Sequence, residues 1–231
     1  MNESLDIEIP RHLPAITLPN TVLFPQVILP LHIFEERYQQ MVRDSLERDR
    51  IFAVLTLKEE PDEDDMPNLE PPYSIASAGI IRACQDLENG HSNLIVQGLC
   101  RIRVEGILQE EPYRKIAIRP LSSDSTGSPE ADLSSLRSRL LGGLHRKQRL
   151  GAPVTQEIMQ FLKDVKDPEV VADLVAFSLC PEVSDRLALL ANLKVEERLR
   201  QLIRLTEKEI AELLLRNQLQ GGLEDGDIEK N

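Results

Sequence analysis

The chain has 231 residues, a formal net charge of −12 at pH 7 and an apolar fraction of 41%, with only 3% aromatic residues. A chain of this length can bury one large core or two modest ones, and here the core must rest on Leu, Ile and Val. The negative charge disfavours nucleic-acid binders that depend on a long-range positive field, and three cysteines without a CxxC pair suggest neither a disulfide framework nor a zinc site.

The N-terminal residues MNESLDIEIPRHL are acidic where a signal peptide needs a basic start and then a long apolar core. No apolar run approaches the roughly 18 residues that a membrane-spanning helix needs. We therefore expect a soluble, cytoplasmic protein without membrane contact. Its three thiols, Cys84, Cys100 and Cys180, are expected to be buried in a reducing compartment.

The first organised stretch, Leu18 to Tyr38, carries three prolines in an apolar run. Each proline removes a backbone donor, so Val22 to Leu29 is predicted to be an edge or looping segment rather than a central strand. Apolar residues then recur at three- and four-residue spacing, which predicts an amphipathic helix over about 33–47, opened by Pro30. This apolar face consists of Leu31, Phe34, Tyr38, Met41 and Val42.

About six short strands are predicted, because short apolar or alternating runs are separated by turn residues. Asn89-Gly90 predicts a hairpin, and Glu105-Gly106 predicts a further turn. Together these runs indicate a compact, barrel-like antiparallel sheet. They cover 15–18, 51–57, 74–84, 94–96, 101–104 and 113–121.

An acidic loop, Lys58 to Pro72, separates two of these strands. Its carboxylates lack the alternating spacing, central glycine and distal glutamate of a calcium-binding EF-hand loop. A solvated loop is the expectation, and no metal site is predicted.

The serine-rich stretch 122–130 is predicted to be a linker, and helical periodicity follows it. The expected organisation is a strand domain at 13–121, a helical domain at 131–219 with a long last helix from Val195 to Leu219, and flexible tails at 1–12 and 220–231. A basic cluster marks the first of these helices. We interpret it as a solvated face, with an anionic partner as the alternative; its members are Arg137, Arg139, Arg146, Lys147 and Arg149.

A set of prolines, glycines, charged and apolar residues occurs along the first half of the chain in a recognisable order. They are Pro25, Pro30, Leu31, Phe34, Glu35, Arg37, Tyr38, Gly79, Gly98 and Arg101, with Val96 and Ile102 beside them. These positions resemble the Lon protease N-terminal, substrate-binding domain family in its stand-alone bacterial form. The resemblance spans roughly residues 13 to 215, although Ile80 and Arg82 depart from the family pattern. It implies mainly structural roles for these positions and an α+β fold, with a PUA-like antiparallel β-barrel that carries one or two helices, followed by an α-helical bundle.

No catalytic motif stands out, because the four histidines share no motif and neither GxSxG, HExxH nor GxxxxGK[ST] occurs. We therefore expect a non-enzymatic protein without cofactor or metal. The resemblance implies recognition of unfolded or extended polypeptides, with a protease or chaperone system as the expected partner. A regulatory or scaffold module for a small ligand or a folded partner is the alternative, RNA binding ranks lower because aromatic residues are scarce, and the oligomeric state stays open.

Overall fold

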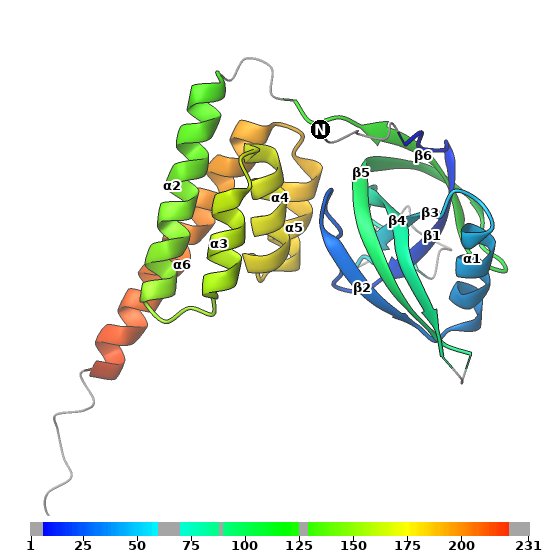
Figure 1. Ribbon diagram of the computed structural model, residues 1–231, viewed down its shortest axis with the longest axis horizontal. Helices are drawn as coiled ribbons and strands as arrows, with labels where there is room; N and C mark the ends of the chain where they lie inside the picture. The colour runs from blue at the N-terminus through cyan, green and yellow to red at the C-terminus, as the bar shows by residue number, and fades with distance from the viewer. Residues whose placement is uncertain (1–6, 60–69, 88–89, 125–128, 222–231) are drawn as a thin grey trace, which may run out of the picture. The chain divides into compact units, whose positions relative to one another are not determined.

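The computed structural model describes residues 7–59, 70–87, 90–124 and 129–221. In these ranges the chain forms an α+β structure with six strands and six helices (Figure 1). Contacts divide the chain into two units, residues 1–123 with 181–193, and residues 124–180 with 194–231. The first unit contains every described strand and two helices; the second contains the other four helices.

The strands form one six-stranded sheet in the order β2-β5-β4-β3-β1-β6, and β6 also pairs with β5. Five strands are thereby joined in a ring of pairings, and β2 pairs only with β5 among the described strands. The strands are β1 (His12–Leu18), β2 (Ile28–Ile33), β3 (Ile51–Thr56), β4 (Ile75–Asp86), β5 (Ser92–Gln109) and β6 (Lys115–Leu121).

Two sequence predictions about the sheet are wrong. First, the sheet is not purely antiparallel, since β1 pairs with β3 in parallel; the intervening β2 and helix α1 (Glu36–Leu46) return the chain to the same end of the sheet. Second, Glu105-Gly106 does not turn the chain, because β5 continues to Gln109. Its pairing with β6 shifts register between Val104 and Gly106, so this glycine lies at a bulge within the strand.

Helix α1 confirms the predicted amphipathic helix but begins later than expected, at Glu36. Pro30 does not open it, because Pro30 and Leu31 belong to β2, where they pair with Ile95 and Leu94. The pattern from 28 to 33 alternates between exposed and buried residues, which is the period of a strand. The buried face of the helix contains Tyr38, Met41 and Val42, as the spacing predicts. The prediction is wrong for Leu31 and Phe34, which precede the helix, and Phe34 is exposed.

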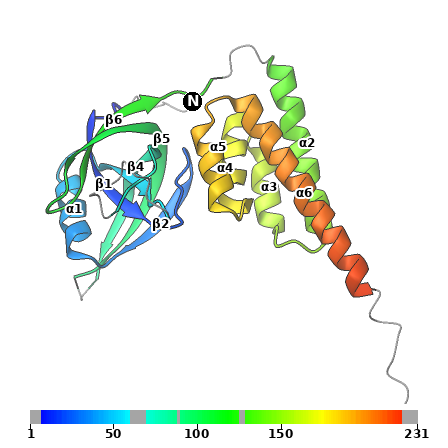
Figure 2. The same cartoon turned by 180° about the vertical axis from the view of Figure 1, so that it is seen from behind.

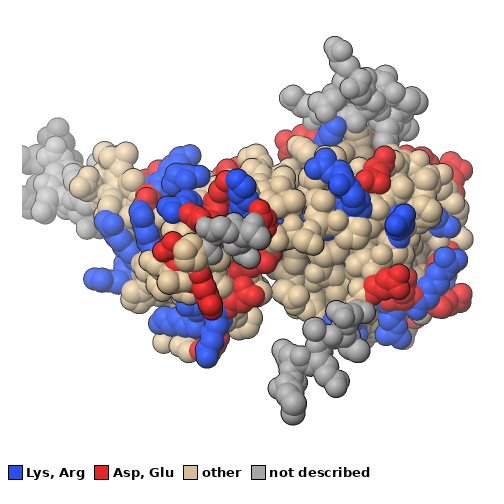
Figure 3. Space-filling model, turned by 90° about the horizontal axis from the view of Figure 1, so that it is seen from above, with Lys and Arg blue, Asp and Glu red and all other residues tan. Residues whose placement is uncertain are grey.

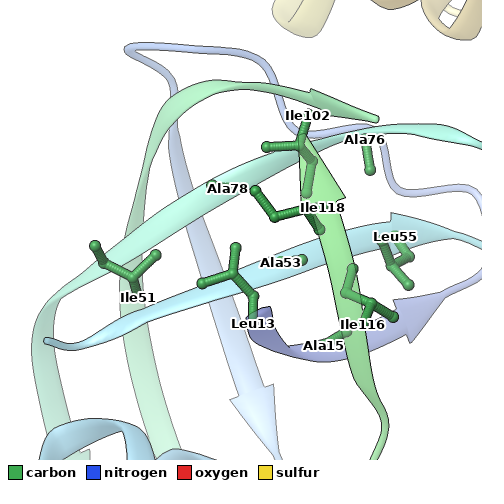
Figure 4. Packing of buried hydrophobic residues seen from close by; sticks show 10 residues of the cluster. All are labelled: Leu13, Ala15, Ile51, Ala53, Leu55, Ala76, Ala78, Ile102, Ile116 and Ile118. Atoms are coloured by element: carbon green, nitrogen blue, oxygen red, sulfur yellow. The ribbon is translucent and has the colours of Figure 1, made fainter. Parts of the chain in front are cut away.

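The core of the strand unit lies inside the ring of strands (Figure 4). Small residues such as Ala53 and Ala78 alternate with large ones such as Leu55 and Ile102, so that side chains from different strands interdigitate. The cluster comprises Leu13, Ala15, Ile51, Ala53, Leu55, Ala76, Ala78, Ile102, Ile116 and Ile118.

All the predicted helical stretches after residue 130 form helices. They are α2 (Glu130–Arg149), α3 (Gln156–Asp164), α4 (Pro168–Leu179), α5 (Val183–Ala191) and α6 (Val195–Gly221). Figure 2 shows α2 running beside α6, and Gly143 permits this approach, since a Cβ there would lie 3.1 Å from Thr206 Cγ2. The expected boundaries at 122–130 and 219 stay predictions. Helix α5 contacts β4 and groups with the strand unit, although it follows the linker in sequence.

A buried ion cluster holds α4 to α6 in the helical unit. The Arg198 side chain is 1% exposed and donates hydrogen bonds of 2.9 Å to Asp173 and 2.9 Å to Glu169. The Asp173 side chain is 2% exposed, so both charges of the Arg198–Asp173 pair are shielded from water. Removal of the Asp173 charge would leave the buried Arg198 with only the more exposed Glu169 as counter-ion, which is more costly than loss of a surface pair.

We predict that Asp173→Ala lowers the free energy of unfolding by about 3–5 kcal/mol, because Arg198 keeps its burial and loses a counter-ion. Arg139→Ala is the matched control. It removes an exposed pair with Glu207 and should cost less than about 1 kcal/mol. Urea unfolding followed by circular dichroism measures both values, and equal losses would contradict this account.

Candidate functional site

The residues Asn20 to Val27, here called the crossing segment, pass over the outer side of three strands in succession. Thr56 on β3 donates from its hydroxyl to the carbonyl of Thr21 at 2.6 Å. Ser77 on β4 likewise donates to the carbonyl of Leu23 at 2.6 Å. Each polar strand side chain therefore satisfies a backbone oxygen of a segment that is in no ladder.

The crossing segment makes its closest contact at Gly98 on β5. Gly98 N–H donates to Val27 O at 2.9 Å, and Gln26 N–H donates to Gly98 O at 2.9 Å. A Cβ built on Gly98 would overlap the carbonyl oxygen of Phe24 and lie 3.2 Å from Pro25 Cα. Glycine is therefore required because two backbones approach each other here.

Arg101, directly opposite Ser77 in the pairing of β4 with β5, also lies next to the crossing segment and is only 2% exposed. Its Nε donates to the carbonyl of Leu190 on α5 at 3.0 Å, and its guanidinium lies 5.9 Å from the ring centroid of Phe24. Arg186 on the same helix donates to the carbonyl of Asn20 at 3.3 Å. These bonds explain why α5 belongs to the strand unit.

A second group of motif residues forms an ion network at the start of α1. Arg37 donates to both carboxylate oxygens of Glu70, at 3.1 and 3.0 Å, and to Glu35 at 2.9 Å. The hydrogen bond with Glu70 raises the pKa of Arg37 above its usual value. Burial raises the pKa of Tyr38, whose hydroxyl donates to the carbonyl of Thr17 at 3.3 Å. These side chains bond to other groups of the same chain, so we interpret the network as structural.

The outer face of β2 and its partner strand carries exposed apolar side chains. Ile28 is 49% exposed, Phe34 is 58% exposed and Ile95 on β5 is 38% exposed. Pro30, directly opposite Ile95, is also exposed. We call the outer face formed by Ile28, Pro30, His32, Phe34 and Ile95 the apolar strip; none of its members is an acid, a lysine or an arginine. Apolar side chains gathered on one face commonly mark an interaction surface.

Two of the four histidines, which share no sequence motif, lie close together at this strip: His32, a member of the strip, and His91. The ring centroids of His32 and His91 are 5.2 Å apart, and those of Phe34 and His91 are 6.4 Å apart. His32 Nδ1 lies 2.9 Å from Asn93 Oδ1 across the strand pair. The hairpin between β4 and β5 brings His91 to β2. The pairing of β2 with β5 was not predicted, so no sequence pattern indicated this cluster.

The thiols and the acidic loop are the other candidate features of the sequence. Only Cys180 is buried as expected, while Cys84 and Cys100 are half-buried, and burial raises the pKa of both of these thiols. Most of the acidic loop, residues 60–69, lies outside the described residues. Within the described ranges, no cluster of three or more His, Cys, Asp or Glu side chains could hold a metal ion.

Most of the basic cluster on α2 serves the helical unit itself. Arg137 caps the end of α3 by donating to the carbonyls of Leu162 and Val165, and Arg139 pairs with Glu207 at 2.6 Å. Lys147 pairs with Glu209. Figure 3 shows Lys and Arg next to Asp and Glu over this unit. On the face that Figure 3 shows, the mixture of charges fits the solvated face that was predicted.

Two hollows open on the strand unit near α1. The larger, about 700 Å³, lies beside Arg37, Arg43 and Glu110. The smaller, about 170 Å³, contains Tyr113, whose hydroxyl donates to Asp44 at 2.6 Å. Burial, followed by this hydrogen bond, raises the pKa of Tyr113 to about 12.

Over the part of the chain that the structure describes, no helix has the length and apolar character needed to cross a bilayer.

Comparison with known proteins identifies relatives over nearly the whole chain. Residues 12–208 match the family of the ATP-dependent protease La (LON) substrate-binding domain. The chain is 26% identical to a Lon protease of Syntrophus aciditrophicus over all of this chain and 29% of that protein. It is 27% identical to a Lon protease of Dictyoglomus thermophilum over all of this chain and 28% of that protein. The chain thus spans less than a third of these relatives.

Solved structures show the same fold at low sequence identity. The N-terminal domain of a Mycobacterium avium complex Lon protease has a TM-score of 0.66 at 16% identity, covering 85% of this chain and 98% of that one. A Lon N-terminal domain protein from Xanthomonas campestris has a TM-score of 0.61 at 22% identity, covering 84% and 97%. These likenesses confirm the mixed α+β fold.

We predict that Gly98→Ala lowers the free energy of unfolding by about 3 kcal/mol or more, because its methyl group meets backbone that cannot rotate away. Gly106→Ala, on the same strand, is the control: a Cβ there meets nothing within 4 Å, so the change should stay within about 1 kcal/mol. Chemical denaturation of both variants tests this, and a Gly98→Ala protein as stable as Gly106→Ala would refute the close crossing.

Proposed function

The chain belongs to the family of the ATP-dependent protease La (LON) substrate-binding domain, and from this premise we propose that it recognises unfolded or extended polypeptides without catalysing a reaction. The apolar strip is the observation that carries the proposal. It presents Ile28, Phe34 and Ile95 on one face without a charged member, and such a surface suits apolar segments that a folded protein would hide. A cytoplasmic location, beside a protease or chaperone system, is part of the same proposal.

The arrangement of the strands around this strip supports the proposed function. We infer that the ring of pairings through β5, β4, β3, β1 and β6 is a PUA-like β-barrel that serves as a rigid scaffold. The strip lies on β2 and β5, and the crossing segment at Gly98 sets where β2 begins. A rigid support of this kind reduces the entropy lost when a ligand binds.

A regulatory or scaffold role is the second candidate. The polar hollow of about 700 Å³ beside Arg37, Arg43 and Glu110 has the size of a small-molecule site. Its lining is charged rather than apolar, and Arg37 is already engaged by Glu35 and Glu70. Stoichiometric capture of a small ligand or one folded partner, without affinity for unfolded chains, would favour this candidate.

The proposal predicts that the purified chain binds a reduced, carboxymethylated reporter protein that cannot fold. The double variant Ile28→Ser with Phe34→Ser should weaken this binding at least about tenfold, since each apolar contact contributes on the order of 1 kcal/mol. Fluorescence anisotropy with labelled reporter measures the dissociation constant.

Phe161→Ser is the matched control, because Phe161 on α3 is 55% exposed and belongs to the other unit. It should leave the dissociation constant unchanged. If Phe161→Ser weakens binding as much as the double variant does, the strip is not the site. If the wild-type chain does not bind the unfolded reporter at all, polypeptide recognition itself is wrong.

A further inference from the structure

The backbone of β2 has one side that no described strand occupies. β2 pairs with β5 alone, in the register Leu29 with Val96 and Leu31 with Leu94. Gly98 N–H donates to Val27 O, which places Val27 among the residues whose backbone groups face β5. Because these groups alternate along a strand, Leu29, Leu31 and Ile33 also face β5.

The alternate residues Ile28, Pro30 and His32 therefore direct their backbone groups away from β5. Within the described ranges, the structure shows no backbone hydrogen bond from any of these three residues to a segment outside the β2–β5 ladder. All three are also exposed. This open edge offers carbonyl acceptors at all three positions but donors at only two, because proline has no N–H.

The side chains of the same three residues form part of the apolar strip. Burial alternates along β2, with Leu29 and Ile33 inward and Ile28, Pro30 and His32 outward. A chain that paired along this edge would place every second side chain next to the strip, since side chains alternate between the two faces of a sheet. One extended segment could thus engage both the backbone edge and the strip.

From this geometry we infer that bound polypeptides add a strand to the open edge of β2. The inference rests on the proposed function and specifies how that function is performed. The partner is an extended, uncharged segment of about five residues, because Ile28 and His32 are roughly 13 Å apart along the strand. Main-chain bonds supply affinity with little sequence preference, and apolar side chains at alternate positions supply the contact with the strip.

Pro30 disfavours pairing of this edge with the same edge of a second copy of the chain. Loss of the central donor weakens any continuous ladder along β2, which is how edge strands commonly avoid aggregation. Pro30 therefore leaves two anchoring donors for a short ligand while it disfavours a long strand partner.

The test uses the full chain and an eight-residue peptide that alternates valine and serine, labelled for fluorescence anisotropy. Two further peptides carry N-methyl groups on either all valines or all serines, so that only one set of alternate N–H groups is blocked in each. Since only one set can face β2, one methylated peptide should bind at least about tenfold more weakly than the parent and the other about as well. Equal affinity, or equal loss, for the two methylated peptides would overturn strand addition.

Pro30→Val provides an independent measurement, because it keeps an apolar side chain on the strip and restores the missing donor. We expect it to bind the unmethylated peptide about three- to tenfold more tightly. Unchanged or weaker affinity would count against the mode. Binding of the unfolded reporter together with a failed methylation pattern would reject strand addition and leave the proposed function standing, whereas no binding of reporter or peptide would reject both.

Discussion

The strand unit depends on one place where two backbones touch, the passage of Phe24 and Pro25 over Gly98. The crossing segment has no ladder of its own, so its carbonyls rely on hydroxyl groups of Thr56 and Ser77. β2 begins immediately after this contact, and its exposed face carries the proposed binding surface. The position of that surface is therefore set by backbone packing that leaves no space for a side chain, and not by the residues of the surface itself.

Buried arginines provide the long-range connections of both units. Arg101 joins β5 to α5, Arg198 joins α6 to α4, and Arg114 on the chain before β6 donates to the hydroxyl of Thr17 and the carbonyl of Glu70. Each is at most 6% exposed. Desolvation of such cations is costly, so these contacts add less to stability than their number implies. The buried arginines disfavour other arrangements of the strands and helices, because an arginine buried without its hydrogen-bond partners would carry an uncompensated charge.

The sequence patterns predicted those features that depend on local periodicity. The helices after residue 130 and the amphipathic face around Met41 follow from spacing alone, and the family resemblance rested on positions such as Gly98 and Arg101. The parallel pairing of β1 with β3 and the meeting of His32 with His91 depend on contacts between distant segments, which periodicity does not encode. Gly106 illustrates a local ambiguity, since the same residue suits a turn or a bulge. For the proposed site, the prolines indicated an edge or looping segment at Val22 to Leu29, but Pro30 itself was wrongly expected to open the helix. The exposure of Ile28 and Ile95 depends on the pairing register, which the sequence pattern does not contain.

Helix α5 has a consequence for how this architecture can change during evolution. It lies in sequence between two helices of the helical unit yet packs with the strands, so the chain passes between the units three times, near residues 123, 180 and 193. Neither unit is encoded by one uninterrupted gene segment. A truncation after residue 123 would remove the Leu190 acceptor of Arg101 and the Arg186 donor to Asn20. Recombination that shuffles domains as contiguous blocks would damage both units, so they are expected to be inherited as a pair.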